Sequence, residues 1–200
     1  TFLNKSKPEI LKLVQHRKIR IGYFSADVML HPVAHLIAGV LEKHDRDRFE
    51  IYVYMFGSKK DEMTERIKRS VGEFRDMNKR DDLECVEQAR ADELDIVIDL
   101  MGNTKNARMA LFSSRLAPVQ VSYLGYPGTT GSTEMDYVIG DDVFIPPQLD
   151  EYFTETVIRK PGCYMCFDDT TEISDKAFSR EELGLPQDAF VLTGFHSSYK

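Results

Sequence analysis

Two histidines and an aspartate lie in a polar loop that follows a β-rich stretch, and their types could support proton transfer. The loop, residues 25–36, reads SADVMLHPVAHL and contains Asp27, His31 and His35. A histidine there could act as a general base or orient one, because its pKa lies near working pH. A loop that leads into a helix also offers free N–H groups and the positive end of the helix dipole.

The same residues have ordinary explanations. His31 could be a turn residue, and His35 could lie on the surface or in the core of the helix that follows. On spacing alone, these explanations are favoured. The two histidines are four residues apart and could share a metal ion, but the Glu of an HExxH motif is not between them. The sequence therefore predicts no metal site here.

Two further loops combine glycine with hydrogen-bonding side chains. Residues 99–108 read DLMGNTKNAR, where Gly102 permits close backbone approach and the polar residues after it could bind a ligand. Residues 124–132 read LGYPGTTGS, which is neither the P-loop nor the GxGxxG pattern. Each loop could also be an ordinary capped or glycine-rich turn. Their shared position, directly after a predicted strand, strengthens the interpretation as one site.

A parallel sheet would bring these loops together. Strand-like and helix-like stretches alternate along the chain, which predicts an α/β fold: a Rossmann-like, mainly parallel sheet with helices on both faces. Ligands of such sheets lie at the carboxyl ends of the strands. The predicted strands are residues 18–24, 49–56, 95–100, 119–124, 136–139 and 156–159, with a weak one near Phe74, and the predicted helices are residues 33–43, 61–70, 81–92 and 107–114.

A second boundary is predicted late in the chain. Three prolines and the polar stretch 168–176 interrupt the alternation. A short helix over residues 178–185 and a strand over 189–195 then open another α/β unit. Because an α/β unit that stops on its first strand is incomplete, we expect this chain to be a fragment of a longer protein.

Composition narrows the class of protein. The 200 residues carry a net charge of −7, which argues against binding a nucleic-acid backbone. No apolar run approaches the roughly 20 residues that a membrane helix needs. The three cysteines include a lone CxxC, Cys163 and Cys166, which favours neither a disulfide framework nor zinc. We expect a protein of the reducing cytoplasm, without nucleic-acid or membrane partners.

Taken in order, the three loops resemble the catalytic region of the protein O-GlcNAc transferase family, in the form of a bacterial-type homologue. The matching stretches are RIGYFSADVMLHPVAHL, DLMGNTKNAR and APVQVSYLGYPGTTGSTEMDYVIGD. The terminal GFHSSYK resembles the opening of the family's nucleotide-binding lobe. These stretches fall in order over nearly all of residues 18–200, and the ordered set is more specific than any one of them.

The resemblance implies the N-terminal lobe of a GT-B type glycosyltransferase. Its domains would be a linker helix at 1–17, the N-terminal catalytic Rossmann-like lobe at 18–165, and an interlobe linker with the truncated start of the nucleotide-sugar-binding lobe at 166–200. The implied reaction is inverting transfer of N-acetylglucosamine from UDP-GlcNAc to Ser or Thr hydroxyls, without a metal or other cofactor. The implied partners are the nucleotide sugar, a protein or peptide acceptor, the C-terminal lobe and upstream TPR repeats. The isolated fragment is expected to be inactive.

The resemblance also implies roles for individual residues. His31 and Asp27 match the histidine and acidic positions of the active site, and either could assist removal of the acceptor proton. Lys200 matches the lysine that meets the UDP diphosphate, with Ser197 nearby; without a metal, a lysine and a helix N-terminus must stabilise the leaving charge. The residues that would line the sugar and acceptor cleft are Gly102, Asn103, Thr104, Lys105, Leu124, Gly125 and Pro127.

Departures from the family pattern leave alternatives open. Relatives often have Asn before the active-site histidine and Thr two residues after it, whereas this chain has Leu30 and Val33. The same fold could use another nucleotide sugar, such as UDP-glucose or GDP-fucose. A non-catalytic interaction module that kept the fold is the alternative from a different class.

Overall fold

The computed structural model describes residues 17–194 of the chain. Its contacts divide the chain into two compact units, Thr1–Asp169 and Thr170–Lys200. Ser197, Lys200 and almost all of the expected linker helix lie outside the described residues.

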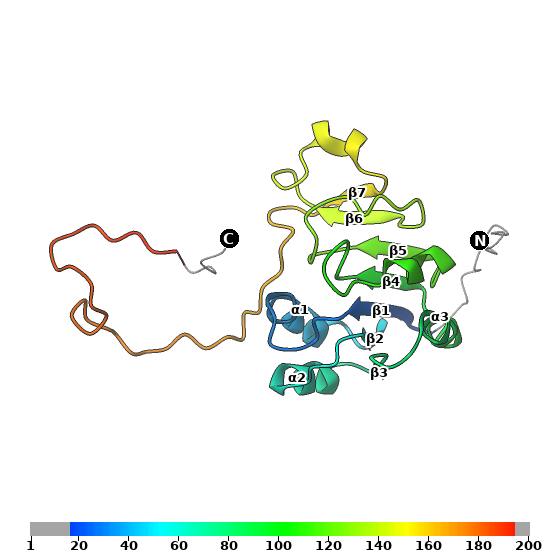
Figure 1. Ribbon diagram of the computed structural model, residues 1–200, viewed down its shortest axis with the longest axis horizontal. Helices are drawn as coiled ribbons and strands as arrows, with labels where there is room; N and C mark the ends of the chain where they lie inside the picture. Colours follow the sequence, from blue (N-terminus) through cyan, green and yellow to red (C-terminus); the bar gives the residue numbers. More distant parts are fainter. Residues whose placement is uncertain (1–16, 195–200) are drawn as a thin grey trace. The chain divides into compact units, whose positions relative to one another are not determined.

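The first unit is built on a seven-stranded sheet in which every strand pair is parallel, and the arrows in Figure 1 point the same way. The spatial order is β3-β2-β1-β4-β5-β6-β7. The strands are β1 (Ile19–Ser25), β2 (Phe49–Met55), β3 (Glu73–Asp76), β4 (Ile96–Asp99), β5 (Val119–Ser122), β6 (Tyr137–Gly140) and β7 (Thr156–Arg159). The chain thus builds outward from β1 to β3, then returns to place β4 on the other side of β1. The carboxyl ends of β1 and β4 therefore form the topological switch point at which such sheets bind ligands.

Helices cover both faces of this sheet, which confirms the predicted fold class. Helices α1 (Pro32–Lys43) and α2 (Glu62–Ser70) pack on one face, while α3 (Asp82–Ala91) and the 3₁₀ helix η1 (Met109–Ser114) pack on the other. A second 3₁₀ helix, η2 (Pro147–Tyr152), precedes β7. Among the described residues, no helix has both the length and the apolar character that crossing a membrane requires.

Alternation along the strands explains the two cores. In β1, Ile21 and Tyr23 pack against α1 and α2, whereas Phe24 stacks on Tyr54 in the core beneath α3. Neighbouring residues of a strand point to opposite faces, so a strand buried on both faces must be apolar throughout. This requirement accounts for the unbroken apolar stretches that predicted the strands.

Helix α1 begins at Pro32, inside the stretch 25–36 that the sequence marked as the first polar loop, because of two local features. His31 is its N-cap, with extended backbone, and Pro32 occupies the first turn, where a missing N–H costs nothing. The apolar residues Ala34, Ile37 and Leu41 then recur at helical spacing and are buried against the sheet. The start of the helix therefore fixes where His31 lies relative to the end of β1.

Two elements expected after the first unit are wrong. Residues 178–185 contain no helix: residues 180–184 form turns, and Leu185 N donates to Arg180 O at 2.8 Å. Phe178 and Leu183 are more than half exposed, and so short a helix takes most of its stability from packing an apolar face. Residues 189–194 form no strand with any described residue, and Phe190 and Leu192 are exposed.

The loop after β5 packs backbone against backbone on the end of β4. A Cβ atom on Gly125 would lie 1.9 Å from the carbonyl oxygen of Leu100 and 2.9 Å from its carbonyl carbon. Leu124, just before it, has a φ of +73°. Only glycine at position 125 permits this approach, which brings the second and third polar loops together.

We predict that Gly125→Ala destabilises the protein by about 1–3 kcal/mol, because the added methyl group would displace the Leu100 backbone. Urea unfolding monitored by circular dichroism measures the change. Gly72→Ala is the control: its Cβ would make ordinary contact at 3.4 Å, and the expected change is within about 0.5 kcal/mol. Equal stabilities for the two variants would show that the close approach does not constrain the fold.

Candidate active site at the switch edge of the sheet

The three polar loops meet beyond the carboxyl ends of β1, β4 and β5. The Met101 sulfur accepts hydrogen bonds from Ser25 Oγ at 3.4 Å and from Ala26 N at 3.3 Å, which joins the first loop to the second. Gly102 lies so close to Tyr126 that a Cβ atom would be 2.3 Å from the tyrosine Cβ, which joins the second loop to the third. The convergence that the sequence predicted is therefore present.

Asp27 and His31 form a pair within the first loop. Asp27 Oδ2 lies 3.6 Å from His31 Nδ1, and the side chains are 17% and 36% exposed. The backbone N–H of Val33 also approaches Nδ1, at 3.3 Å. Asp27 is held in turn by its own backbone N–H, which donates to Ser25 Oγ at 2.9 Å. The ring nitrogen Nδ1 thus lies between a donor and an acceptor.

This geometry allows two tautomers of the neutral ring. When Nδ1 accepts from Val33, the ring proton is on Nε2, which then donates. When Nδ1 carries the proton it faces the Asp27 carboxylate, and Nε2 is free to take a proton from a substrate. Among residues 17–194, Nε2 has no hydrogen-bond partner. The second arrangement is the one that a general base requires.

His35 lies apart from this pair. It is exposed on α1, in agreement with the interpretation as a helix-surface histidine. Within the described part of the chain, no group of three or more His, Cys, Asp or Glu side chains is arranged to hold a metal ion.

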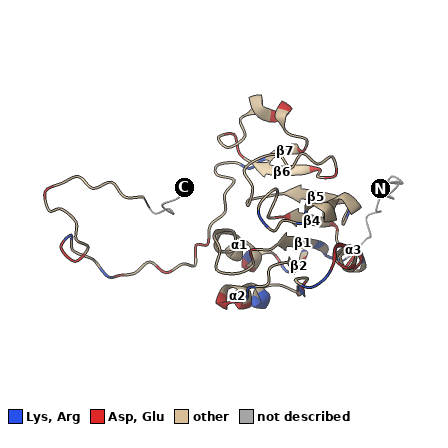
Figure 2. Ribbon diagram, viewed as in Figure 1, with Lys and Arg blue, Asp and Glu red and all other residues tan. Residues whose placement is uncertain are grey.

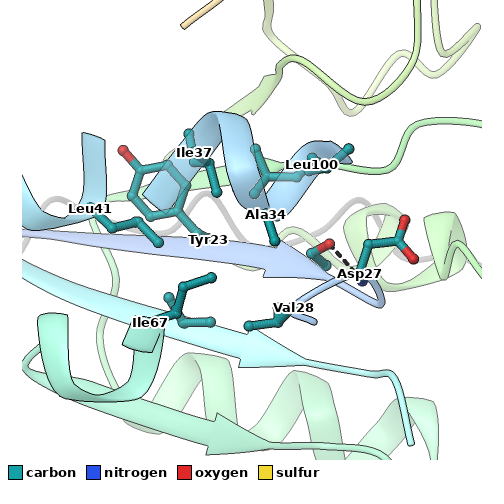
Figure 3. Close-up of a pocket in the computed structure, with 11 residues that line it drawn as sticks. Tyr23, Asp27, Val28, Ala34, Ile37, Leu41, Ile67 and Leu100 are labelled. Atoms are coloured by element: carbon teal, nitrogen blue, oxygen red, sulfur yellow. Dashed lines mark hydrogen bonds between the residues drawn. The ribbon is translucent and has the colours of Figure 1, made fainter. Parts of the chain in front are cut away.

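A narrow pocket lies beneath α1, next to Asp27. Apolar side chains line most of it, and Figure 3 shows the Asp27 carboxylate pointing away from them. The space holds roughly one water molecule, which is far too small for a sugar. The candidate site is therefore the open rim formed by the three loops rather than this pocket.

The second loop is held by a carboxylate that sequence reasoning missed. Asp99, the last residue of β4, is 1% exposed and accepts hydrogen bonds from Met101 N at 3.0 Å and Gly102 N at 2.7 Å. Burial raises the pKa of Asp99 to about 6, and these two hydrogen bonds oppose the rise. An Asp at a strand end with Gly three residues later was the available signal, since Asp stabilises turns through hydrogen bonds to nearby backbone.

The predicted residues of the second loop contribute its exposed surface. Gly102 has a φ of +54°, while Asn103, Thr104 and Lys105 are exposed. The Asn103 amide donates to Thr130 O at 3.3 Å, and Thr104 Oγ1 donates to Met101 O at 2.8 Å. The loop thus presents an amide, a hydroxyl and an ammonium group at the rim, beside the third loop.

A second missed carboxylate fixes the third loop. Glu155, immediately before β7, is 4% exposed and accepts from Thr130 N and Thr129 Oγ1, each at 2.7 Å. The hydroxyls of Thr130 and Thr154 also donate to it. Burial by itself would raise the pKa of Glu155, but these hydrogen bonds outweigh burial and lower it. Glu155 and Thr130 are 25 residues apart in the sequence, so no local sequence pattern predicts their contact.

The remaining predicted residues of the third loop differ in exposure. Pro127 is exposed at the loop tip, whereas Leu124 and Gly125 are partly buried where the loop leaves β5. Along the ribbon in Figure 2, positions of Lys and Arg occur among positions of Asp and Glu. Polar, mostly neutral groups at the rim suit the hydroxyl and amide groups of a sugar.

Comparison with known proteins identifies relatives of this chain. Residues 5–178 match the model of glycosyl transferase family 41. The chain is 34% identical over 191 residues to the probable UDP-N-acetylglucosamine–peptide N-acetylglucosaminyltransferase SEC of Arabidopsis thaliana, covering 92% of this chain and 19% of the relative. A UDP-N-acetylglucosamine–peptide N-acetylglucosaminyltransferase of Caenorhabditis elegans is 31% identical over 184 residues, covering 88% and 16%.

A solved structure is also similar. A mutant of the Thermobaculum terrenum O-GlcNAc transferase matches with a TM-score of 0.73 and 36% identity, over 80% of this chain and 30% of that one. The present chain therefore spans less than a fifth of the curated relatives named above and less than a third of the solved structure.

We predict that Glu155→Gln destabilises the protein by about 1–3 kcal/mol at pH 7, because the amide replaces an oxygen that accepts hydrogen bonds. Since the pKa of Glu155 is lower in the folded state, its contribution to stability is present above the ordinary value of 4.5 and is lost as pH falls through the folded-state pKa. The difference in the free energy of unfolding between wild type and Glu155→Gln should therefore become smaller in acid.

Urea unfolding at pH 7 and at pH 4 measures this gap. Glu151→Gln, on the exposed surface of η2, is the control and should change stability by less than about 0.5 kcal/mol at either pH. A gap that widened in acid would contradict the lowered pKa of Glu155.

Proposed function

Because this chain belongs to glycosyl transferase family 41, we propose that its full-length protein transfers N-acetylglucosamine from UDP-GlcNAc to Ser or Thr hydroxyls of proteins. The observation that carries the proposal is the meeting of the His31–Asp27 pair with two polar loops at the switch edge of a parallel sheet. The relatives' names state the donor and a peptide acceptor. The activity is proposed for the longer protein, since the chain spans 19% of the first of these relatives.

The proposed reaction is a single displacement at the anomeric carbon. The acceptor hydroxyl oxygen attacks C1 of the sugar from the side opposite the nucleotide, the bond from C1 to the diphosphate oxygen breaks, and UDP leaves with the electron pair. The configuration at C1 is inverted. The proton of the acceptor hydroxyl must move to a base, and the negative charge on the diphosphate must be stabilised.

His31 is proposed as that base. In the tautomer with the proton on Nδ1, the ring faces the Asp27 carboxylate 3.6 Å away and Nε2 is the atom that would take the hydroxyl proton. The N-cap position holds the ring at the start of α1, where the chain leaves the end of β1. Asp27 then acts through the histidine, as the acidic member of a dyad.

The second and third loops are proposed to bind the sugar and the acceptor. Gly102, Asn103, Thr104 and Lys105 present hydrogen-bonding groups from one side, and Leu124, Gly125 and Pro127 present backbone and apolar surface from the other. The diphosphate would be met by Lys200, with Ser197 nearby, so that no metal ion is needed. These two residues would belong to the nucleotide-binding lobe.

We predict that the full-length protein transfers sugar from UDP-GlcNAc to a Ser- or Thr-containing protein in the presence of EDTA. The measurement is a donor panel of radiolabelled UDP-GlcNAc, UDP-glucose and GDP-fucose, with incorporation into acceptor protein counted. A preference for GDP-fucose or UDP-glucose would overturn the donor assignment. Absence of binding to every nucleotide sugar would instead favour a non-catalytic interaction module.

We predict that His31→Ala lowers kcat by about 10²- to 10⁴-fold, the usual contribution of a positioned general base. His35→Ala is the matched control, since it removes an exposed imidazole one helical turn further along α1 and should leave kcat within about twofold. Steady-state kinetics of the full-length variants measures both. If His31→Ala retained full activity, the proton would have to be taken by another group.

A further inference from the structure

Asp99 occupies the centre of the switch edge. It ends β4, and in the sheet register it lies between Phe24 of β1 and Ser122 of β5. Its side chain is buried at a position where the same strand otherwise carries apolar residues. A buried carboxylate is costly unless its oxygens are used, so its partners show what it does.

Both oxygens of Asp99 are engaged by the loop that follows. Oδ1 accepts from Met101 N and Oδ2 from Gly102 N, which folds the backbone at once after the strand and sets Gly102 at its positive φ. Two N–H groups of one loop therefore point back at one carboxylate. This arrangement fixes the direction in which Asn103 and Thr104 leave the strand.

The two residues that Asp99 holds are also those that join the three loops. The Met101 sulfur accepts from Ser25 Oγ and Ala26 N, and Ser25 Oγ accepts from Asp27 N. Gly102, for its part, packs against Tyr126 of the third loop. A displacement of Met101 and Gly102 would therefore reach both the histidine dyad and the sugar-binding loops.

We propose that Asp99 is a positioning residue for sugar transfer, an inference that rests on the proposed function. Asp99 holds the loop after β4 in the conformation that aligns the sugar-binding groups with the His31–Asp27 pair. It does not touch the substrate, because its side chain is buried and both oxygens are occupied by backbone N–H groups. Its effect is exerted through Met101 and Gly102.

The protonation of Asp99 is consistent with this role. Burial raises its pKa from 3.8 to about 6, although the N–H groups of Gly102 and Met101 oppose the rise. Between these two pH values the folded protein keeps a proton that the unfolded chain has lost, so the stability from this group is present at low pH and is lost as pH rises through about 6. Near neutral pH the ionised Asp99 carboxylate therefore lowers the stability of the folded protein. Its structural contribution is to accept hydrogen bonds from the two loop N–H groups.

The test compares Asp99→Ala, Asp99→Asn and Asp92→Asn in the full-length protein, with kcat and KM measured for UDP-GlcNAc and a protein acceptor. Asp99→Ala removes both acceptor atoms, and we expect kcat/KM to fall by about 100-fold, the scale of a loss from misplacement by about 1 Å. Asp99→Asn keeps one acceptor oxygen, and its kcat/KM should lie between the values of Asp99→Ala and wild type. It also keeps the inference testable if Asp99→Ala does not fold.

Asp92→Asn is the matched control. Asp92 is also a buried carboxylate, but it accepts from Arg75, and its backbone oxygen accepts from Arg20 near the start of β1, away from the three loops. This variant should lose stability while kcat/KM of the folded protein stays within about twofold. If the Asp99 variants were folded and also stayed within twofold, Asp99 would be a structural residue only and the inference would be overturned.

Hydrogen exchange separates failure of the inference from failure of the proposed function. Asp99→Ala should speed amide exchange about tenfold in residues 99–108 and in residues 25–31, whereas Asp92→Asn should not. If wild type transferred no sugar but this exchange pattern appeared, the function would be wrong and the loop coupling right. If wild type were active and the exchange in residues 25–31 were unchanged, the coupling between the loops would be refuted.

Discussion

One directional constraint underlies the whole site: all seven strands run the same way, so the loops that leave their carboxyl ends open along one edge of the sheet. The reversal of strand order beside β1 then places the loops after β1 and β4 at adjacent positions. Gly125 extends this arrangement to β5 by letting its loop approach the end of β4 backbone to backbone. The chemistry of the rim depends on these backbone relations before it depends on any side chain.

Carboxylates that collect backbone N–H groups then hold the loops in place. Asp99 and Glu155 do so for the second and third loops. Asp61, the N-cap of α2, accepts from Leu30 N at 2.8 Å and so steadies the first loop, and these hydrogen bonds lower the pKa of Asp61. Asp141 accepts from the backbone after β6 and from Tyr164 N. Each of these carboxylates thus satisfies backbone donors that would otherwise lack a partner, and so restricts the loop to which it is bound.

The sequence predicts the framework of this site but not the groups that fix it. Parallel strands and their order of loops follow from apolar runs alternating with amphipathic stretches, and both signals are local. Glu155 lies 25 residues from its partner Thr130, so only the folded chain brings them together. The expected helix at 178–185 fails for the converse reason: its local pattern is helical, yet Phe178 and Leu183 have too little buried surface to stabilise it.

The contrast between local sequence pattern and folded structure also applies to the His31–Asp27 pair. Spacing alone favours a turn residue for His31, and the structure does place it at a turn, as the N-cap of α1. Capping and catalysis make opposite demands on Nδ1 and therefore need different tautomers: a cap needs it to accept from Val33, while a base needs it to carry the proton that faces Asp27. Exchange between these tautomers costs one weak hydrogen bond at 3.3 Å and gains a charge-assisted one if the ring closes on Asp27. In the proposed reaction, a substrate hydroxyl at Nε2 would favour the second state, so that His31 would cap the helix at rest and serve as the base only when substrate is bound at the rim.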